Sequence, residues 1–148
     1  MIDAHDLEEK AVYPRIIINQ SVVREFTTFS RSIPLLYDKK DDAIFIDFLS
    51  AKMREDLHLE YEKVILKGKV DNKNLDFFKS EPKEIKDNIL NAIQTNTNDR
   101  VIEKYEWLAH YFNYFCYTHK DLDLNELIIE THKDENDCLN NFCNILDV

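Results

Sequence analysis

TNDRVIEKYEWLAHYFNYFCYTH, residues 97–119, contains the only tryptophan of the chain and its densest group of aromatic residues. Steps of three and four place five apolar side chains on one face of a helix: Val101, Tyr105, Leu108, Phe112 and Phe115. Trp107, Tyr111 and Tyr114 form a second apolar face beside it. Because a helix with so wide an apolar surface must be covered on two sides, we expect other elements to pack around it.

The length and composition predict one globular domain. A chain of 148 residues with 44% apolar residues is long enough to bury a sizeable core. We predict an α+β fold over residues 1–148, with a small sheet of three to four strands. Residues 1–50 make up an α/β part, and residues 51–148 a mainly helical part.

Strand patterns occur mostly in the first part. The β-branched run RIIIN, residues 15–19, is typical of a strand buried on both faces. Residues 33–37 and 43–48 flank the polar turn DKKDD and predict a hairpin. Pro34 indicates that the first strand of this hairpin begins at a sheet edge. Residues 124–129 fit either a strand or a short helix.

The helical patterns need start and stop signals. Thr97 or Asn98 is the expected cap of the aromatic helix, and Asp99 favours the positive end of its dipole. Ser80-Glu81-Pro82 is expected to open the preceding helix, after a polar connection over residues 71–79. The remaining helices are predicted over residues 3–12, 21–29, 51–68 and 138–146.

Charge and glycine content exclude several classes of function. The formal charge of −10 argues against a nucleic-acid-binding surface, because phosphate contacts need clustered lysine and arginine. Gly68 is the only glycine, although average usage would predict about ten. Phosphate loops and nucleophile turns of the GxGxxG, Walker A and GxSxG types are therefore excluded.

The cysteines and the apolar runs bear on location. Three cysteines without a CxxC pair do not suggest a secreted disulfide framework. MIDAHDLEEK, residues 1–10, lacks the apolar region of a signal peptide, and no apolar run reaches 18 residues. We expect a cytoplasmic protein that does not enter a membrane.

Four aspartates bracket the predicted hairpin turn and are candidate ligands of Mg²⁺ or Ca²⁺: Asp38, Asp41, Asp42 and Asp47. Their spacing is not that of an EF-hand, and aspartate is a common turn residue. The favoured interpretation is a solvated turn.

Two further groups of side chains are candidates. Cys116 and His119 are an i, i+3 pair that could share a metal, with His110, His132 or Cys138 as further ligands, although buried free cysteines are common. His58 and His110 fit surface or packing positions better than catalytic ones. Trp107, Tyr111 and Tyr114 form a candidate partner-binding face, but we favour the core for them.

Three segments in order resemble bacterial class III nucleotidyl-cyclase-like proteins, including the pyrimidine cyclases of antiphage signalling. AHDLEEKAVYPRIIIN (residues 4–19) is similar to their helix and YPRI-type strand, and DKKDDAIFIDFLS (residues 38–50) to the strand that follows. KYEWLAHYFN (residues 104–113) resembles a motif near their C-terminus. The resemblance covers roughly residues 4–117.

The resemblance also has gaps. The family's metal-binding aspartates precede the YPRI-type strand and have no counterpart in this chain, and Phe112 stands where the late motif has histidine. No catalytic residue is therefore carried over. The resemblance implies the C-terminal half of such a protein, whose edge strand at residues 15–19 would pair with a second copy or a partner protein.

Three functions follow as hypotheses. The first is a partial cyclase-like signalling protein, non-catalytic alone and acting through protein contacts, with no cofactor unless a partner brings Mg²⁺ or Mn²⁺. The alternative is a small acidic inhibitor, an immunity protein or antitoxin, that binds a basic partner by charge complementarity. The third is a metal-dependent nucleotide enzyme that uses the carboxylates between Asp38 and Asp47.

Overall fold

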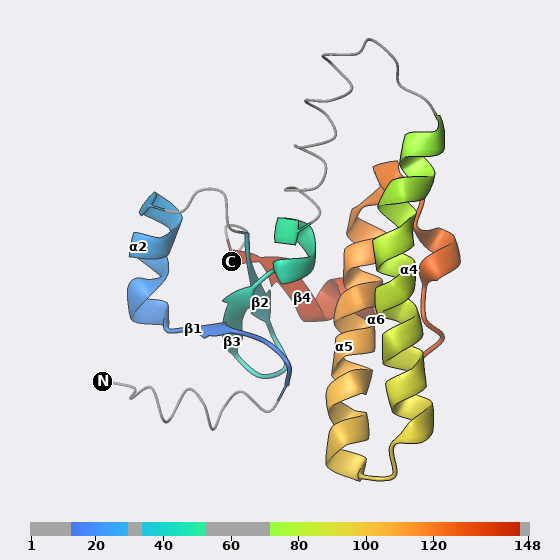
Figure 1. The fold of residues 1–148 in the computed structure, drawn as a ribbon. Helices are drawn as coiled ribbons and strands as arrows, with labels where there is room; N and C mark the ends of the chain where they lie inside the picture. The colour runs from blue at the N-terminus through green and yellow to red at the C-terminus, as the bar shows by residue number, and fades with distance from the viewer. Residues whose placement is uncertain (1–12, 30–33, 53–71, 146–148) are drawn as a thin grey trace.

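The computed structural model describes residues 13–29, 34–52 and 72–145 of the chain. The predicted helix over residues 3–12 lies outside these ranges. Of the helix predicted over residues 51–68, only residues 51 and 52 are described, at the end of a helical segment that begins at Phe48. Within the described part the fold is α+β, as predicted: an antiparallel sheet of four strands and a helix-rich C-terminal half (Figure 1).

The sheet is assembled from both ends of the chain. Its strands are β1 (Ile17–Ile18), β2 (Leu35–Asp38), β3 (Ala43–Ile46) and β4 (Phe142–Asn144). They lie in the order β1-β3-β2-β4, and each neighbouring pair is antiparallel. The predicted hairpin of β2 and β3 is confirmed, with Leu36 opposite Phe45. The register places Leu36 and Phe45 on one face, toward the helices.

Two strand predictions need correction. β1 lies at the sheet edge, as the resemblance implied, but it is not buried on both faces: its two residues are only half-buried, and the preceding Ile16 is 60% exposed. β2 is central, between β3 and β4, although Pro34 indicated a sheet edge. Pro34 lies just before the strand, where its carbonyl accepts a hydrogen bond from the Asp47 amide at 2.9 Å and its missing N–H is not needed.

The C-terminal prediction is also corrected. Residues 138–146 do not form one helix: α6 (Glu135–Asn141) ends at Phe142, where the backbone turns extended and enters β4. Phe142 reaches the core from this strand, so tertiary packing overrides a weak helical pattern. Residues 124–129 take the helical alternative, because Asn125–Leu127 forms a short 3₁₀ turn, η2, after a similar turn η1 (Lys120–Leu122).

Besides α6 and the helical segment at residues 48–52, the described part of the fold contains three longer helices. α2 (Gln20–Phe29) follows β1 and matches the helix predicted over residues 21–29, and in its first turn the Ser21 amide donates to the Asn19 side chain at 2.9 Å. α4 (Asn72–Thr95) begins eight residues before Ser80 and contains Pro82 in its interior. The predicted polar connection over residues 71–79 and the predicted start at Ser80 are therefore wrong. α5 (Asp99–Thr118) is the predicted aromatic helix, capped by Asn98 as expected.

α5 is covered on more than one side, as its two apolar faces predict. α4 runs antiparallel beside it, and the sheet and α6 pack on other parts of its surface (Figure 1). Phe45 of β3 forms the centre of the contact with the sheet, with ring centroids 5.5 Å from Trp107 and 5.3 Å from Tyr111. Replacing such a buried phenylalanine with alanine typically costs about 3–5 kcal/mol.

Candidate functional site

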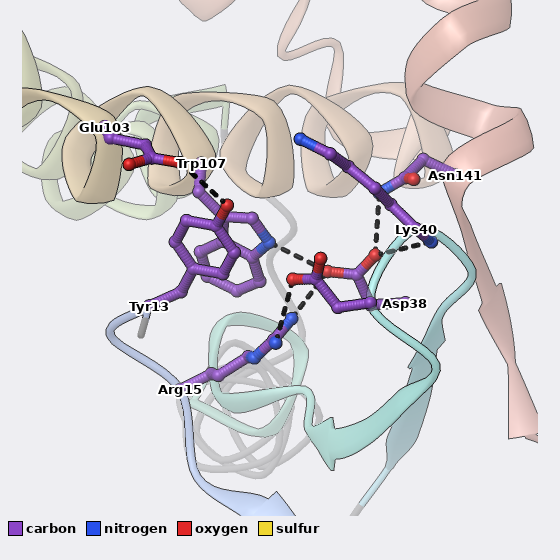
Figure 2. Close-up of polar contacts among 8 residues, drawn as sticks. Tyr13, Arg15, Asp38, Lys40, Glu103, Trp107 and Asn141 are labelled. Carbon is purple, nitrogen blue, oxygen red and sulfur yellow. Dashed lines mark hydrogen bonds and ion pairs between the residues drawn. The ribbon is translucent and has the colours of Figure 1, made fainter. Parts of the chain in front are cut away.

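Asp38 at the end of β2 lies at the centre of a buried polar site. Its side chain accepts four hydrogen bonds: from Arg15 Nη1 at 2.6 Å, Trp107 Nε1 at 2.9 Å, Asn141 Nδ2 at 3.1 Å and the Lys40 amide at 3.1 Å (Figure 2). Asp38 is 0% exposed. A carboxylate so buried is stable only when paired and hydrogen-bonded, and here both conditions are met.

Arg15 supplies the positive charge of this site. Its second terminal nitrogen, Nη2, donates to Asp41 at 3.0 Å, so two carboxylates share one guanidinium. The guanidinium carbon also lies 5.1 Å from the ring centre of Tyr13 and 5.3 Å from that of Trp107. A planar guanidinium can donate to two carboxylates through separate nitrogens while it stacks on aromatic faces, whereas a compact ammonium group has no plane to stack and no fixed fork of donors. The buried Nε of Arg15 has no acceptor among the described residues.

Tyr13 closes the aromatic side of the site. Its ring stacks on Trp107 with centroids 5.4 Å apart and an angle of 11° between the planes (Figure 2). The Tyr13 hydroxyl donates to Glu103 at 3.4 Å. Partial burial, together with the nearby Asp41 and Glu103 carboxylates, raises the pKa of this phenol above its usual value. Tyr13 therefore stays uncharged and keeps its proton for Glu103.

A second polar network surrounds Asp47, at the other end of the hairpin. Asp47 Oδ1 accepts from the Ser50 amide at 3.1 Å, so it caps the helical segment that begins at Phe48. The Tyr111 hydroxyl donates to the same oxygen at 2.6 Å and accepts from the Leu49 amide at 3.1 Å. Burial and the Asp47 charge raise the pKa of Tyr111 far above its normal range.

The four candidate metal ligands do not converge on one point: Asp38 and Asp41 share the Arg15 guanidinium, whereas Asp42 and Asp47 accept from different tyrosines. Asp38 and Asp47 are buried, so the solvated-turn interpretation is wrong for these two residues. Asp41 pairs with Arg15, and Asp42, at a positive φ of 51°, accepts from the Tyr37 hydroxyl. Among the described residues, no three histidine, cysteine, aspartate or glutamate side chains converge as a metal site would require.

The aromatic candidates divide between core and rim. Trp107 and Tyr111 are buried, in agreement with the favoured assignment to the core. Tyr114 is half-buried and lies with its ring 5.5 Å from that of Phe142. The first two residues contribute to the polar sites above through Nε1 and the hydroxyl, which their apolar spacing did not indicate.

The cysteine and histidine candidates have separate environments. Cys116 is buried, which raises the pKa of its thiol to about 12, and burial raises that of Cys138 to about 11. Both thiols are therefore protonated at neutral pH. The Nδ1 atom of His119 lies 2.9 Å from the Phe115 carbonyl oxygen. Burial, with the charges of Lys133, His132 and Lys40, lowers the pKa of His110 to about 4.

Acidic side chains gather on the segment between α5 and β4. Six of them are exposed and are named together here as the acidic ridge: Asp123, Glu126, Glu130, Asp134, Glu135 and Asp137. Apolar residues alternate with them and are buried against the core: Leu122, Leu124, Leu127 and Ile129. The Asn113 amide of α5 clamps the segment, since it donates to the Ile129 carbonyl and accepts from the Ile129 amide, each at 2.8 Å.

Comparison with known proteins adds no assignment. No protein-family model, no curated protein and no solved structure matches this chain. Among the described residues, no helix has both the length and the apolar character needed to cross a membrane.

Sequence analysis missed Arg15, Asn113 and Asn141. A signal for Arg15 existed, because an arginine at the start of the apolar run RIIIN needs a carboxylate partner if that strand is packed. Asn113 and Asn141 had no such signal, since asparagine is ordinary on an exposed helix or at its end. Only the fold shows that they bond Ile129 and Asp38.

Proposed function

We propose that this chain is a non-catalytic binding protein that acts through protein contacts, and that it captures a basic partner on the acidic ridge. The observation that carries this proposal is the way the ridge is held. Asp123, Glu126 and Glu130 lie on irregular backbone with two 3₁₀ turns, which buried leucines and the Asn113 clamp fix against α5. Asp134, Glu135 and Asp137 lie at the start of α6, where Asp134 and Asp137 form a capping box. A backbone fixed in this way loses little conformational entropy on binding, which favours recognition.

The charge of the ridge supports the same proposal. Residues 123 to 137 carry six carboxylates and one lysine, Lys133, in a chain whose formal charge is −10. Lys86 of α4 adds a second cation beside them, since it donates to the Glu126 and Ile128 carbonyls at 3.3 and 3.5 Å. A surface of one sign accelerates the encounter with an oppositely charged protein and makes the association sensitive to salt. An inhibitor that masks a cationic surface, such as an immunity protein or antitoxin, has these properties.

The test compares two variants with the same loss of charge. In the first, Glu126, Glu130 and Glu135 of the ridge become glutamine; in the second, Glu25 and Glu84 become glutamine and Asp87 becomes asparagine, all exposed residues on α2 and α4. Proteins retained from a lysate of the source organism are identified, and the strongest binder is purified and titrated by calorimetry. We expect the ridge variant to bind it at least tenfold more weakly than the control variant.

Salt provides the second criterion. Raising the ionic strength from about 0.05 M to 0.3 M shortens the Debye length from about 14 Å to about 6 Å and should weaken binding to the wild-type chain. Equal affinities of the two variants, or binding that is independent of salt, would contradict the proposal.

A second proposal follows from the cyclase-like resemblance and is favoured by the edge position of β1. In it, the chain is the non-catalytic half of a signalling protein, and a second copy or a partner extends the sheet beside the exposed Ile16. Light scattering and thermal shift, alone and with a nucleoside triphosphate plus Mn²⁺, test it. A dimer that nucleotide and metal stabilise supports this proposal; an unresponsive monomer at high concentration rejects it.

A further inference from the structure

The groups around Asp38 form a site that exists independently of Arg15. Trp107 Nε1, Asn141 Nδ2 and the Lys40 amide converge on the carboxylate from α5, the end of α6 and the hairpin turn. These three donors orient the carboxylate. Two of them come from helices α5 and α6 and the third from the β2–β3 turn, so none depends on the segment that carries Arg15.

The shape of the site suits one type of cation. Asp38 and Asp41 bind different terminal nitrogens of the Arg15 guanidinium, at 2.6 and 3.0 Å, while the faces of Tyr13 and Trp107 flank it. Two carboxylates that accept from separate nitrogens of a guanidinium, together with aromatic rings that lie beside its plane, favour a guanidinium over an ammonium group. The site is therefore specific for arginine, with an aromatic residue two positions before it to stack on Trp107.

Among the described residues, the segment Tyr13-Pro14-Arg15 contacts this site through its side chains. Tyr13 and Arg15 make the aromatic and ionic contacts, and the next residue, Ile16, is 60% exposed. The backbone is held from Ile16 onward: its carbonyl accepts from the Ile46 amide at 3.1 Å, and the two residues of β1 pair with β3 at the sheet edge. The Arg15 Nε has no acceptor among the described residues.

We propose that Asp38, Asp41 and Trp107 form an arginine-binding site, which the chain's own Tyr13-Pro14-Arg15 segment fills and which an arginine of a partner protein occupies by displacing it. A second copy of this chain is the poorer occupant. Its segment is chemically identical, whereas the intramolecular segment has the advantage of an effective concentration in the millimolar range. A basic partner has a further advantage over a second copy, because this chain carries a formal charge of −10 and copies of it repel one another.

This inference does not rest on the acidic ridge, and its test uses a different probe. The full-length Arg15→Ala variant is titrated with the acetylated and amidated peptide Tyr-Pro-Arg, and with Tyr-Pro-Lys as the matched control. Trp107 is the only tryptophan of the chain and lies in the site, so its fluorescence reports occupancy directly. We expect saturable binding of the arginine peptide, at least tenfold tighter than that of the lysine peptide.

The wild-type chain should bind the arginine peptide at least tenfold more weakly than Arg15→Ala, because its own segment competes. If Arg15→Ala does not fold alone, the titration is followed by circular dichroism instead of fluorescence. Recovery of the helical signal with the arginine peptide, and not with the lysine peptide, then supports the site. The inference is overturned by an equal response to both peptides, by no response to either peptide in the variant, or by equal binding to wild type and variant.

Discussion

Asp38 and Asp47 stand at opposite ends of the same hairpin, and both are buried, yet they are stabilised in different ways. Asp47 accepts hydrogen bonds from two buried groups: the Ser50 amide three residues later and the Tyr111 hydroxyl of α5. Asp38 also receives core donors, but its charge is balanced by Arg15, which belongs to the segment before the edge strand.

The difference separates a structural carboxylate from a recognition site. A carboxylate that caps a helix and bonds a core tyrosine has no contact that can be exchanged without unfolding its surroundings. A carboxylate whose counter-ion is carried by a peripheral segment has one contact that another arginine can replace. The predictions below test this comparison, from the largest expected effect to the smallest.

The largest effect is expected for Arg15→Met, which keeps most of the side-chain volume and removes the charge. Asp38 is then buried without a cation, and breaking a buried ion pair on one side costs about 3–5 kcal/mol. Urea denaturation followed by Trp107 fluorescence measures it. The double variant with Asp38→Asn should recover part of the loss, and a single variant as stable as wild type would show that Arg15 does not compensate Asp38.

A smaller loss is expected for Tyr111→Phe. It leaves the Leu49 amide without its acceptor and removes one donor from Asp47, which retains the Ser50 amide. Leaving a buried polar group unsatisfied costs about 1–3 kcal/mol. Urea denaturation should place this variant between wild type and Arg15→Met, and a loss as large as that of Arg15→Met would remove the distinction between the two sites.

Because the pKa of His110 is lowered in the folded protein, we expect the free energy of unfolding to depend on pH. Burial and three nearby cationic or titratable groups, Lys133, His132 and Lys40, lower its folded-state pKa to about 4, while Asp137 opposes them. The unfolded chain, with a pKa near 6.5, therefore binds the proton first. The contribution of His110 is fully present above about pH 6.5 and is lost as the pH falls toward 4.

The size of this effect is about 1–2 kcal/mol, because His110 is half-buried and water screens its exposed side. Urea denaturation at pH 7.5 and 4.5 measures it in wild type and in His110→Gln, which has no titrating ring. The difference between the two proteins isolates His110 from the carboxylates. Parallel pH profiles would contradict the prediction, as would an NMR titration of the ring near pH 6.5.

The smallest effect is expected at an exposed ion pair. Lys52 Nζ lies 3.2 Å from a carboxylate oxygen of Glu81 in α4, and both side chains are largely exposed to water. Pairs of this kind contribute about 0–1 kcal/mol, so Lys52→Met should shift the urea midpoint far less than Arg15→Met. A comparable shift would mean that burial is not what makes the Arg15 pair important.

The elements that sequence analysis predicted well depend on local patterns. α5 was found from its 3.6-residue periodicity and its Asn98 cap, and the β2–β3 hairpin from two β-rich runs around a polar turn. The start of α4 was missed because Pro82 was taken as an opening residue, although it lies inside the helix. β4 was missed because three residues after a short helix carry too little pattern to distinguish a strand.

The sequence by itself determined the aromatic helix, the hairpin, the α+β class and the acidic surface, because each depends on neighbours within a few residues or on composition. Only the tertiary structure decided that Asp38 meets Arg15, Trp107 and Asn141, from positions 23, 69 and 103 residues away. It also placed β4 beside β2 and Asn113 against Ile129. Contacts over such separations depend on the packing of whole elements, and single residues carry no local signal for them.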